Sequence, residues 1–131
     1  MELIRAMKRC ENGLPRCGER GRHLGVRVSK ETSSVIDIEV DSTGRVRPGI
    51  GGMSVVLDTR YLPPALLPPP IGYGKDSVYS IEERNLGPML CYRPDSTRAS
   101  EHGFVEPKSE IAIEAYQAAL CATARSWRHL L

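Results

Sequence analysis

Aromatic side chains are scarce in this sequence, whose 131 residues include one tryptophan, one phenylalanine and five tyrosines. Because aromatic residues bury more surface each than most other types, a chain with few of them must build its core mainly from aliphatic side chains. Apolar runs are short as well, and none approaches the ~20 residues of a bilayer-spanning helix. The opening segment MELIRAMKRC has no apolar stretch of signal-peptide length. We therefore expect no membrane segment and no secretory signal.

Cysteines are few and dispersed, at Cys10, Cys17, Cys91 and Cys121. Zinc ligands normally come as closely spaced pairs. Only Cys10 and Cys17 are near each other, with six residues between them, so we expect no metal site. The even count permits two disulfides, but without a secretory signal we expect reduced, buried thiols instead.

Familiar nucleotide-binding motifs are missing from the one glycine-rich stretch, RVRPGIGGMSVVLD at residues 45–58. The Gly-x-Gly-x-x-Gly spacing is absent, and a β-branched run follows where a helix is required. No Gly-Lys-Ser/Thr follows, and GGMSV lacks the second glycine of a Gly-x-Ser-x-Gly nucleophile turn. What remains is Ser54 at the start of a strand, just after Gly51 and Gly52. The glycines form either a plain turn or a clearance for a ligand, and Ser54 either caps the turn or donates to that ligand.

Positive charge is unevenly placed, although the net charge is only +2. Residues 1–30 contain eight lysines and arginines against three glutamates, whereas the remainder contains ten basic and thirteen acidic residues. A basic N-terminal third suits an anionic ligand or partner, such as a phosphate, a nucleic acid or an acidic protein. A solvated arginine-rich surface explains the same composition.

Strands dominate the middle of the chain. The first segment, residues 1–10, is either a short strand or a helical turn. Runs rich in β-branched residues and bounded by turn residues predict strands at 24–29, 33–40, 53–58, 76–83, 88–94 and 102–107. The five prolines of YLPPALLPPP exclude a strand there and predict a rigid connector, with a helical turn at residues 64–67 and leucines that pack on the core.

The C-terminal segment has a helical pattern. From Ser109 onward, apolar residues recur at steps of three or four through Leu131, which predicts an amphipathic helix with Ser109 as its N-cap. Strands followed by a closing helix predict one α+β domain that spans residues 1–131.

His102 stands in the β-prone segment HGFVEP. If this segment is extended, His102, Phe104 and Glu106 share one face. An imidazole and a carboxylate on one face can orient or polarise a substrate. A surface histidine and a strand-end glutamate account for the same pair, and no spacing distinguishes a Cys-His or Ser-His-Asp hydrolase.

The order of these segments resembles a family of small type VI secretion effector toxins with an ADP-ribosyltransferase-like fold. The matching pieces span most of the chain and are LIRAM, GRHLGVRV, VRPGIGGMSVVLD, YLPPALL, EHGFVEP and EAYQAALCATARSW. The most specific piece is Gly-Gly-x-Ser-Val at residues 51–55, supported by His-x-x-x-x-Pro at 102–107 and by a closing helix that ends in Trp127. The resemblance implies a split β-sheet core that clasps NAD, followed by a C-terminal amphipathic helix.

The resemblance also implies roles for particular residues. Arg5 in LIRAM would contact the phosphates or ribose of NAD, and Ser54, with the glycine pair before it, would shape the nicotinamide pocket. A third residue would assist an oxocarbenium-like transfer, and Glu106 and His102 are the candidates. A carboxylate at that place would stabilise the positive charge that develops on the ribose.

Two functions therefore follow from the sequence. The resemblance implies a bacterial toxin that acts in the cytoplasm, is delivered by a secretion system without a signal peptide, uses NAD to modify an unknown target, and is neutralised by a cognate immunity protein or antitoxin. The alternative is a non-catalytic protein- or nucleic-acid-binding module, either a degenerate transferase fold or an immunity-like protein. Met53, where the family has a small or hydroxylated residue, and the lack of a Gln-x-Glu or Glu-x-Glu pair keep this alternative open.

Overall fold

The N-terminal segment forms a strand, β1 (Glu2–Met7), in the computed structural model, which describes residues 1–29 and 35–131. Leu3 and Met7 pack into one hydrophobic cluster and Ile4 and Ala6 into another, because successive side chains of a strand point to opposite faces. Burial on both faces explains why residues 2–7 of this segment form a strand and not a helical turn.

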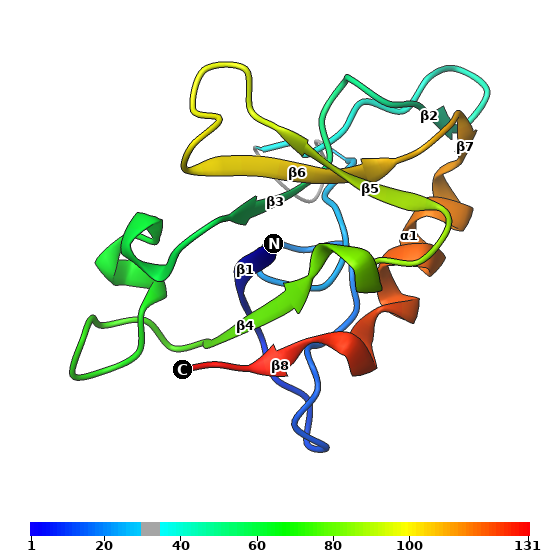
Figure 1. Ribbon diagram of the computed structural model, residues 1–131. Coiled ribbons are helices and arrows are strands. Elements are labelled where there is room, and N and C mark those ends of the chain that lie inside the picture. The colour runs from blue at the N-terminus through cyan, green and yellow to red at the C-terminus, as the bar shows by residue number, and fades with distance from the viewer. Residues whose placement is uncertain (30–34) are drawn as a thin grey trace.

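The protein is an α+β protein whose described residues form a mostly antiparallel sheet and one α-helix near the C-terminus (Figure 1). The main sheet has the strand order β5-β6-β3-β1-β4-β8. Its other strands are β3 (Met53–Val56), β4 (Ser77–Glu82), β5 (Leu90–Pro94), β6 (His102–Pro107) and β8 (Arg128–His129). A two-stranded pair joins β2 (Arg45–Val46) to β7 (Ile111–Ala112), and helix α1 spans Ile113–Ala122. Short 3₁₀ turns lie at Thr59–Tyr61, Pro64–Leu66, Glu83–Asn85 and Ala124–Ser126.

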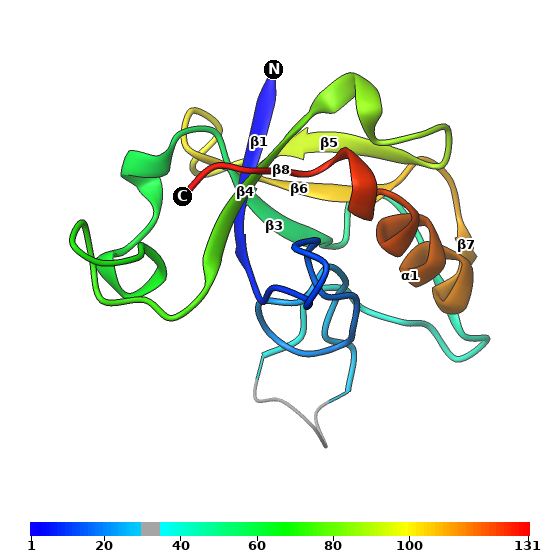
Figure 2. The same cartoon turned by 90° about the horizontal axis from the view of Figure 1, so that it is seen from below.

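The main sheet consists of two halves that meet at a narrow junction. β1 and β4 pair along six residues from Glu2↔Glu82 to Met7↔Ser77, whereas β1 and β3 pair only at Ile4↔Val56. In Figure 2, β1 and β4 run across the direction of β3, β5 and β6. Because β1 and β3 cross, they separate on either side of the junction. Main-chain N–H and C=O groups near the junction must therefore form hydrogen bonds with other parts of the protein.

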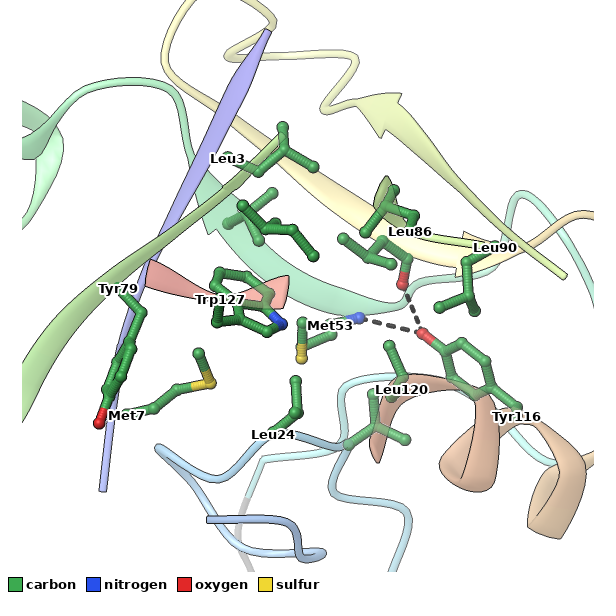
Figure 3. Close-up of a cluster of buried hydrophobic side chains, with 14 of the residues drawn as sticks. Leu3, Met7, Leu24, Met53, Tyr79, Leu86, Leu90, Tyr116, Leu120 and Trp127 are labelled. Atoms are coloured by element: carbon green, nitrogen blue, oxygen red, sulfur yellow. Dashed lines mark hydrogen bonds between the residues drawn. The ribbon is translucent and has the colours of Figure 1, made fainter. Parts of the chain in front are cut away.

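Helix α1 covers the larger hydrophobic cluster (Figure 3). Tyr116 and Leu120 of the helix are fully buried there, and Trp127 follows just beyond it. The Tyr116 hydroxyl donates a hydrogen bond to the carbonyl of Val105 and accepts one from the amide of Met53, at 3.2 Å. Burial raises the pKa of Tyr116. Met53 is itself buried in this cluster, so the large side chain at this position fills the core.

The proline-rich connector packs on the second cluster as the sequence predicts. The 3₁₀ turn Pro64–Leu66 confirms the expected helical turn. Leu62 is buried, and Leu66 and Leu67 are partly buried against it. Within the described part of the chain, no helix is long and apolar enough to cross a membrane.

Four predicted strands, at 53–58, 76–83, 88–94 and 102–107, are confirmed as β3 to β6. The strand predicted at 24–29 is wrong. Main-chain hydrogen bonds link Leu24 to Arg16 and Arg27 to Asp37, but between these points side chains take the hydrogen bonds that a neighbouring strand would make. Val26 bonds through both its amide and its carbonyl to Gln117, and the amide of Arg27 donates to the Asp37 carboxylate.

The strand predicted at 33–40 is also largely wrong. Residues 33–34 lie outside the described residues, and no strand is assigned at residues 35–40, where Ile38 makes an isolated bridge to Gly51 and the amide of Asp37 donates to the carbonyl of Arg27. Ile38 is buried, but Ile36 on the same expected face is 36% exposed. The buried side chain beside Ile38 is instead Asp37, which forms an ion pair with Arg27 at 2.8 Å.

The closing helix is shorter than predicted. It begins at Ile113 and not at Ser109, because Ile111–Ala112 pairs with Arg45–Val46 as a strand, and Ala112 is the N-cap. It ends at Ala122, after which Arg128–His129 pairs with β4. The predicted apolar stripe is nevertheless present, since Tyr116, Leu120 and Trp127 are buried.

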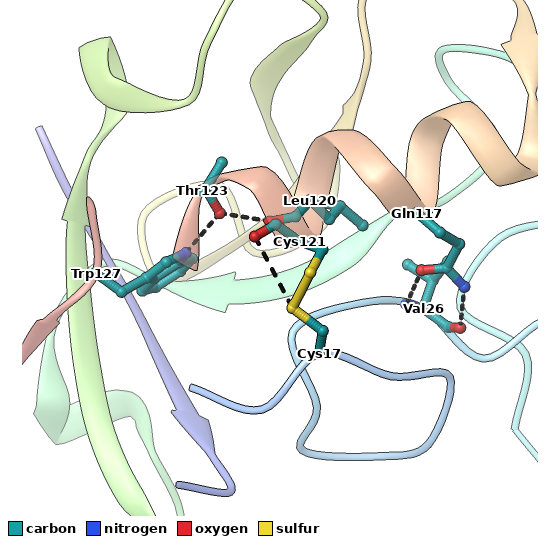
Figure 4. Close-up of a disulfide and its surroundings, with 7 residues drawn as sticks. All are labelled: Cys17, Val26, Gln117, Leu120, Cys121, Thr123 and Trp127. Carbon is teal, nitrogen blue, oxygen red and sulfur yellow. Dashed lines mark hydrogen bonds between the residues drawn. A yellow bond between two sulfur atoms is a disulfide. The ribbon is translucent and has the colours of Figure 1, made fainter. Parts of the chain in front are cut away.

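Cys17 and Cys121 form a disulfide on the surface of the protein, 104 residues apart in sequence (Figure 4). The expectation of four reduced, buried thiols is therefore wrong for this pair, and the remaining two, Cys10 and Cys91, are free and half-buried. The disulfide fastens the N-terminal loop, which is the described segment 8–29 after β1, to α1. It lies beside the two hydrogen bonds of Gln117 to Val26. Sequence spacing missed it because the two cysteines meet only after the fold forms.

Removing the disulfide should destabilise the protein. Cys17→Ser, Cys121→Ser or reductant should lower the free energy of unfolding by about 2–5 kcal/mol, because the bond closes a long loop in the unfolded chain. Thermal and urea unfolding measure the change, with Cys10→Ser as the matched control on the same loop. Equal unfolding midpoints for Cys17→Ser, Cys10→Ser and the oxidised parent would contradict a stabilising bond.

Candidate functional site

A cavity of about 640 Å³ lies beside the β1–β3 junction. This volume is within the range of roughly 300–1,000 Å³ typical of small-molecule sites. Its wall is built by β1, β3, the loop around residues 21–27, the connector at 61–66, and Arg98 with His102. Segments far apart in sequence therefore meet here because the two halves of the sheet cross.

Arg5 of β1 spans the opening of the junction. Its Nη1 donates to the main-chain carbonyl of Ser54 on β3, at 2.8 Å. Its Nε and Nη2 donate to the carbonyl of His23 on the N-terminal loop, at 3.4 and 3.0 Å. The guanidinium thus ties β1, β3 and the loop together through neutral acceptors.

The charge of Arg5 has no carboxylate partner within salt-bridge distance among the described residues. Burial lowers the pKa of Arg5 to about 10, a shift that Asp37 partly offsets, so the side chain stays charged at neutral pH. A cation shielded from water is costly unless it is paired. Five N–H groups are available on a guanidinium and three are used, which leaves two without a hydrogen-bond partner among the described residues.

The remaining charged groups of the wall are also basic. Three further arginines line the cavity, and each forms an ion pair with a carboxylate outside the lining; the pairs are Arg22–Asp76, Arg27–Asp37 and Arg98–Glu101. Lys8 lines it too, 4.0 Å from Asp76. No carboxylate of the described residues belongs to the lining. The cavity therefore favours an anionic ligand.

The connector supplies an apolar side to the cavity. Tyr61, Leu62 and Leu66 line it. The guanidinium of Arg60 lies over the Tyr61 ring, 4.9 Å from its centroid, and supports it from one side. The cavity thus combines a cationic part with an aromatic and aliphatic part.

Ser54 lines the cavity from β3. Its carbonyl holds Arg5, and its hydroxyl makes no hydrogen bond within the described part of the chain. The hydroxyl therefore does not cap a turn and is available to a ligand.

His102 lines the cavity from the start of β6. Its Nδ1 lies 3.0 Å from Asp95 Oδ2, and its ring contacts the ring of Phe104 edge-on. Asp95 also accepts hydrogen bonds from the amide and the hydroxyl of Thr97. The carboxylate partner of His102 is therefore Asp95, whereas Glu106 on the same strand is held elsewhere.

Glu106 lies outside the cavity lining and is buried. Its Oε2 accepts hydrogen bonds from Arg93 Nε and from the amide of Gly49, both at 2.8 Å. Glu106 therefore fastens the Pro48-Gly49 turn to the sheet. A catalytic role for Glu106 stays a prediction that its position in the structure does not favour.

Gly51 and Gly52 also lie outside the lining. A Cβ on Gly51 would lie 2.3 Å from the carbonyl of Asp37, and one on Gly52 would lie 2.7 Å from the carbonyl of Val105. Both residues have positive φ, at 128° and 154°. The close approach of neighbouring main chain explains these glycines, and contact with a cofactor stays a prediction for them.

The structure thus brings together Arg5, Ser54 and His102, three of the four predicted catalytic residues. The basic N-terminal third contributes four cations, namely Arg5, Lys8, Arg22 and Arg27, while its Lys30 lies outside the described residues. Sequence reasoning missed Asp95. The signal that could have found it is the repeated Asp-Ser-Thr at 41–43 and 95–97, two Asp-led turns of which only the second is followed by a histidine.

The fold and site define an α+β protein with a cation-lined cavity at the junction of a crossed antiparallel sheet. Comparison of the chain with protein-family models, curated proteins and solved structures finds no match in any of the three. Within residues 1–29 and 35–131, no group of three or more His, Cys, Asp or Glu side chains is placed to hold a metal ion.

The Asp95 carboxyl should titrate far below an ordinary aspartate. The Thr97 amide, the Thr97 hydroxyl and His102, in that order of effect, lower the pKa of Asp95 from 3.8 to about 2. Because its folded pKa is depressed, its contribution to stability is present above about pH 4 and is lost as the pH falls toward 2.

A carboxyl-detected NMR titration measures this pKa. Thr97→Val removes the hydroxyl and should raise the pKa of Asp95. An Asp95 pKa near 4 in the parent protein would contradict the hydrogen-bonded arrangement.

Proposed function

We propose that the cavity binds NAD and that the protein is an ADP-ribosyltransferase-like enzyme. The observation that carries the proposal is Arg5, a cation in the cavity lining with two unused N–H groups and only neutral partners among the described residues. The diphosphate of a dinucleotide supplies the missing negative charge, and a guanidinium can bind it through two parallel hydrogen bonds.

The described residues fit NAD in two further respects. Arg22 and Arg98 line the same cavity as Arg5, so cationic groups are available to more than one phosphate oxygen. Tyr61 offers an aromatic face to a base or nicotinamide ring, and the leucines beside it exclude water. A ligand with one anionic part and two flat rings matches this division of the cavity.

When bound, NAD supplies an ADP-ribose group on a labile bond to nicotinamide. Arg5 would bind and orient the phosphates or ribose, and the free hydroxyl of Ser54 would hydrogen-bond the ligand beside it. His102 would hold or accept a proton at the cavity wall. Because no described carboxylate lines the cavity, the chemistry would rest on these three side chains and not on Glu106.

The wider biological role follows from the sequence resemblance. We propose a fold like that of the small type VI effector toxins, and the crossed halves of the sheet are compatible with its expected split core. The protein would act in the cytoplasm of a target bacterium, reach it through a secretion system, and be neutralised by a cognate immunity protein or antitoxin.

A second candidate function is a binding module for nucleic acid or an acidic protein. Its support is the exposed group Arg9, Arg16 and Arg20, which form no ion pair with a described carboxylate. These three side chains lie outside the cavity lining. Such binding would be strongly salt-dependent and independent of Ser54.

Expression of the protein in bacteria should arrest growth, and Arg5→Ala or Ser54→Ala should relieve the arrest. Calorimetry should show NAD binding weakened about 10- to 100-fold by Arg5→Ala, since a charge-assisted hydrogen bond contributes about 1.5–3 kcal/mol. Arg5→Lys retains the charge but lacks the paired N–H donors of the guanidinium, so its affinity for NAD should lie between those of Arg5→Ala and the parent. Arg20→Ala is the matched control and should behave as the parent.

Two results would overturn these assignments. A harmless parent protein at verified expression level rules out the toxin, and full toxicity of both variants rules out the site. Salt-sensitive RNA or DNA binding that is lost in the double variant Arg16→Glu/Arg20→Glu and kept in Ser54→Ala would favour the second function.

A further inference from the structure

His102 and Asp95 close the turn that joins β5 to β6, at one wall of the cavity. The amide of Asp95 donates to the carbonyl of His102 at 3.0 Å, and the two side chains meet at the same distance through Asp95 Oδ2 and His102 Nδ1. The other carboxylate oxygen, Oδ1, accepts from the amide and hydroxyl of Thr97, both at 2.9 Å. Oδ1 therefore has two defined donors and Oδ2 faces Nδ1, so the side chain cannot rotate without losing these contacts.

This arrangement fixes the tautomer of His102. An ionised carboxylate can only accept hydrogen bonds, so Nδ1 of the facing imidazole must carry the hydrogen. In a neutral imidazole the other nitrogen, Nε2, is then unprotonated. Nε2 makes no hydrogen bond with any described residue, while the ring lines the cavity and is held from the side by Phe104.

We propose that Asp95 is a positioning residue that holds His102 as the Nδ1–H tautomer and so presents Nε2 to the cavity as a general base. Nε2 would accept the proton of a hydroxyl or water as its oxygen bonds to the carbon that is transferred, while the bond from that carbon to the leaving group breaks and its electron pair departs with the leaving group; the Asp95 carboxylate would stabilise the imidazolium. The use of this base in a transfer reaction rests on the proposed function, whereas the tautomer does not.

Ser54 is not the group that this base serves. In the pairing of β3 with β6, Ser54 lies opposite Phe104 and His102 opposite Val56, so the two side chains are diagonal neighbours. No hydrogen bond joins them in the described structure. The geometry is therefore that of a His-Asp pair facing a ligand space, and not of an assembled Ser-His-Asp triad.

Asp95→Asn tests the proposal because the hydrogen bonds from Thr97 determine the orientation of the new side-chain amide. Two donors from Thr97 require an acceptor at the Oδ1 position, so the amide oxygen should occupy it and the NH₂ group should face His102. Nδ1 must then accept, and the hydrogen moves to Nε2. The variant is nearly isosteric, so the turn should persist while the base is blocked.

The chain offers a matched control in Asp41→Asn. Asp41 opens the other Asp-Ser-Thr turn and accepts from the amide and hydroxyl of Thr43, at 2.9 and 2.6 Å. It has no histidine partner and lies outside the cavity lining. A purely structural effect of removing a turn carboxylate should appear equally in both variants.

Long-range proton–nitrogen NMR correlation of the histidine rings is the direct readout at neutral imidazole. The parent and Asp41→Asn should show His102 protonated at Nδ1, and Asp95→Asn should show it protonated at Nε2. Protonation at Nε2 in the parent, or an unchanged tautomer in Asp95→Asn, overturns the proposal.

Turnover of NAD, followed by nicotinamide release, is the second readout. Asp95→Asn should lower kcat about 10²- to 10⁴-fold with KM nearly unchanged, and Asp41→Asn should match the parent. Equal losses in both variants, or a loss confined to KM, overturn the role as positioning residue. If the parent binds and turns over no NAD while the Nδ1–H tautomer is present, the proposed function fails and the His-Asp pair stands.

Discussion

The guanidinium of Arg5 holds the two halves of the crossed sheet and the N-terminal loop in one arrangement. β1 and β3 share a single residue pair, and the hydrogen bonds of Arg5 to the carbonyls of Ser54 and His23 bridge the space where they part. These acceptors are neutral, so the positive charge is left for the cavity. The same residue thus supports the fold and, because its charge has no carboxylate partner among the described residues, favours the binding of an anion.

The position of the His23 carbonyl depends on how the N-terminal loop is fastened. The loop has little regular structure and is held by the Cys17–Cys121 disulfide, by Gln117 on the main chain of Val26, and by ion pairs to Asp76. Helix α1 is therefore more than a cover for the core. By anchoring this loop it places one acceptor of Arg5 and one wall of the cavity.

Local patterns were sufficient for four of the sheet strands, for the proline-rich connector and for the apolar stripe of the helix, since period and turn residues determine these features. They failed at residues 24–29, where Gln117 and Asp37 replace a strand partner. The order of the sequence segments predicted Arg5, Ser54 and His102 in one site. It could not show that the Glu106 carboxylate is hydrogen-bonded to Arg93 and Gly49, away from that site. Contacts of this kind join residues that are far apart in sequence, and the spacing of residues along the chain does not predict them.

Amide NMR shift mapping during a titration with NAD tests whether an anionic dinucleotide binds at Arg5, as we propose. Perturbed amides should be concentrated at residues 4–6, 54–56, 61–62, 65–66 and 98–102, Arg5→Lys should reduce the perturbations, and high salt should weaken the affinity. The amides of Cys91 and Glu106 should shift little. No perturbation at millimolar NAD, or one confined to the exposed arginines at positions 9, 16 and 20, would contradict the binding of NAD at Arg5.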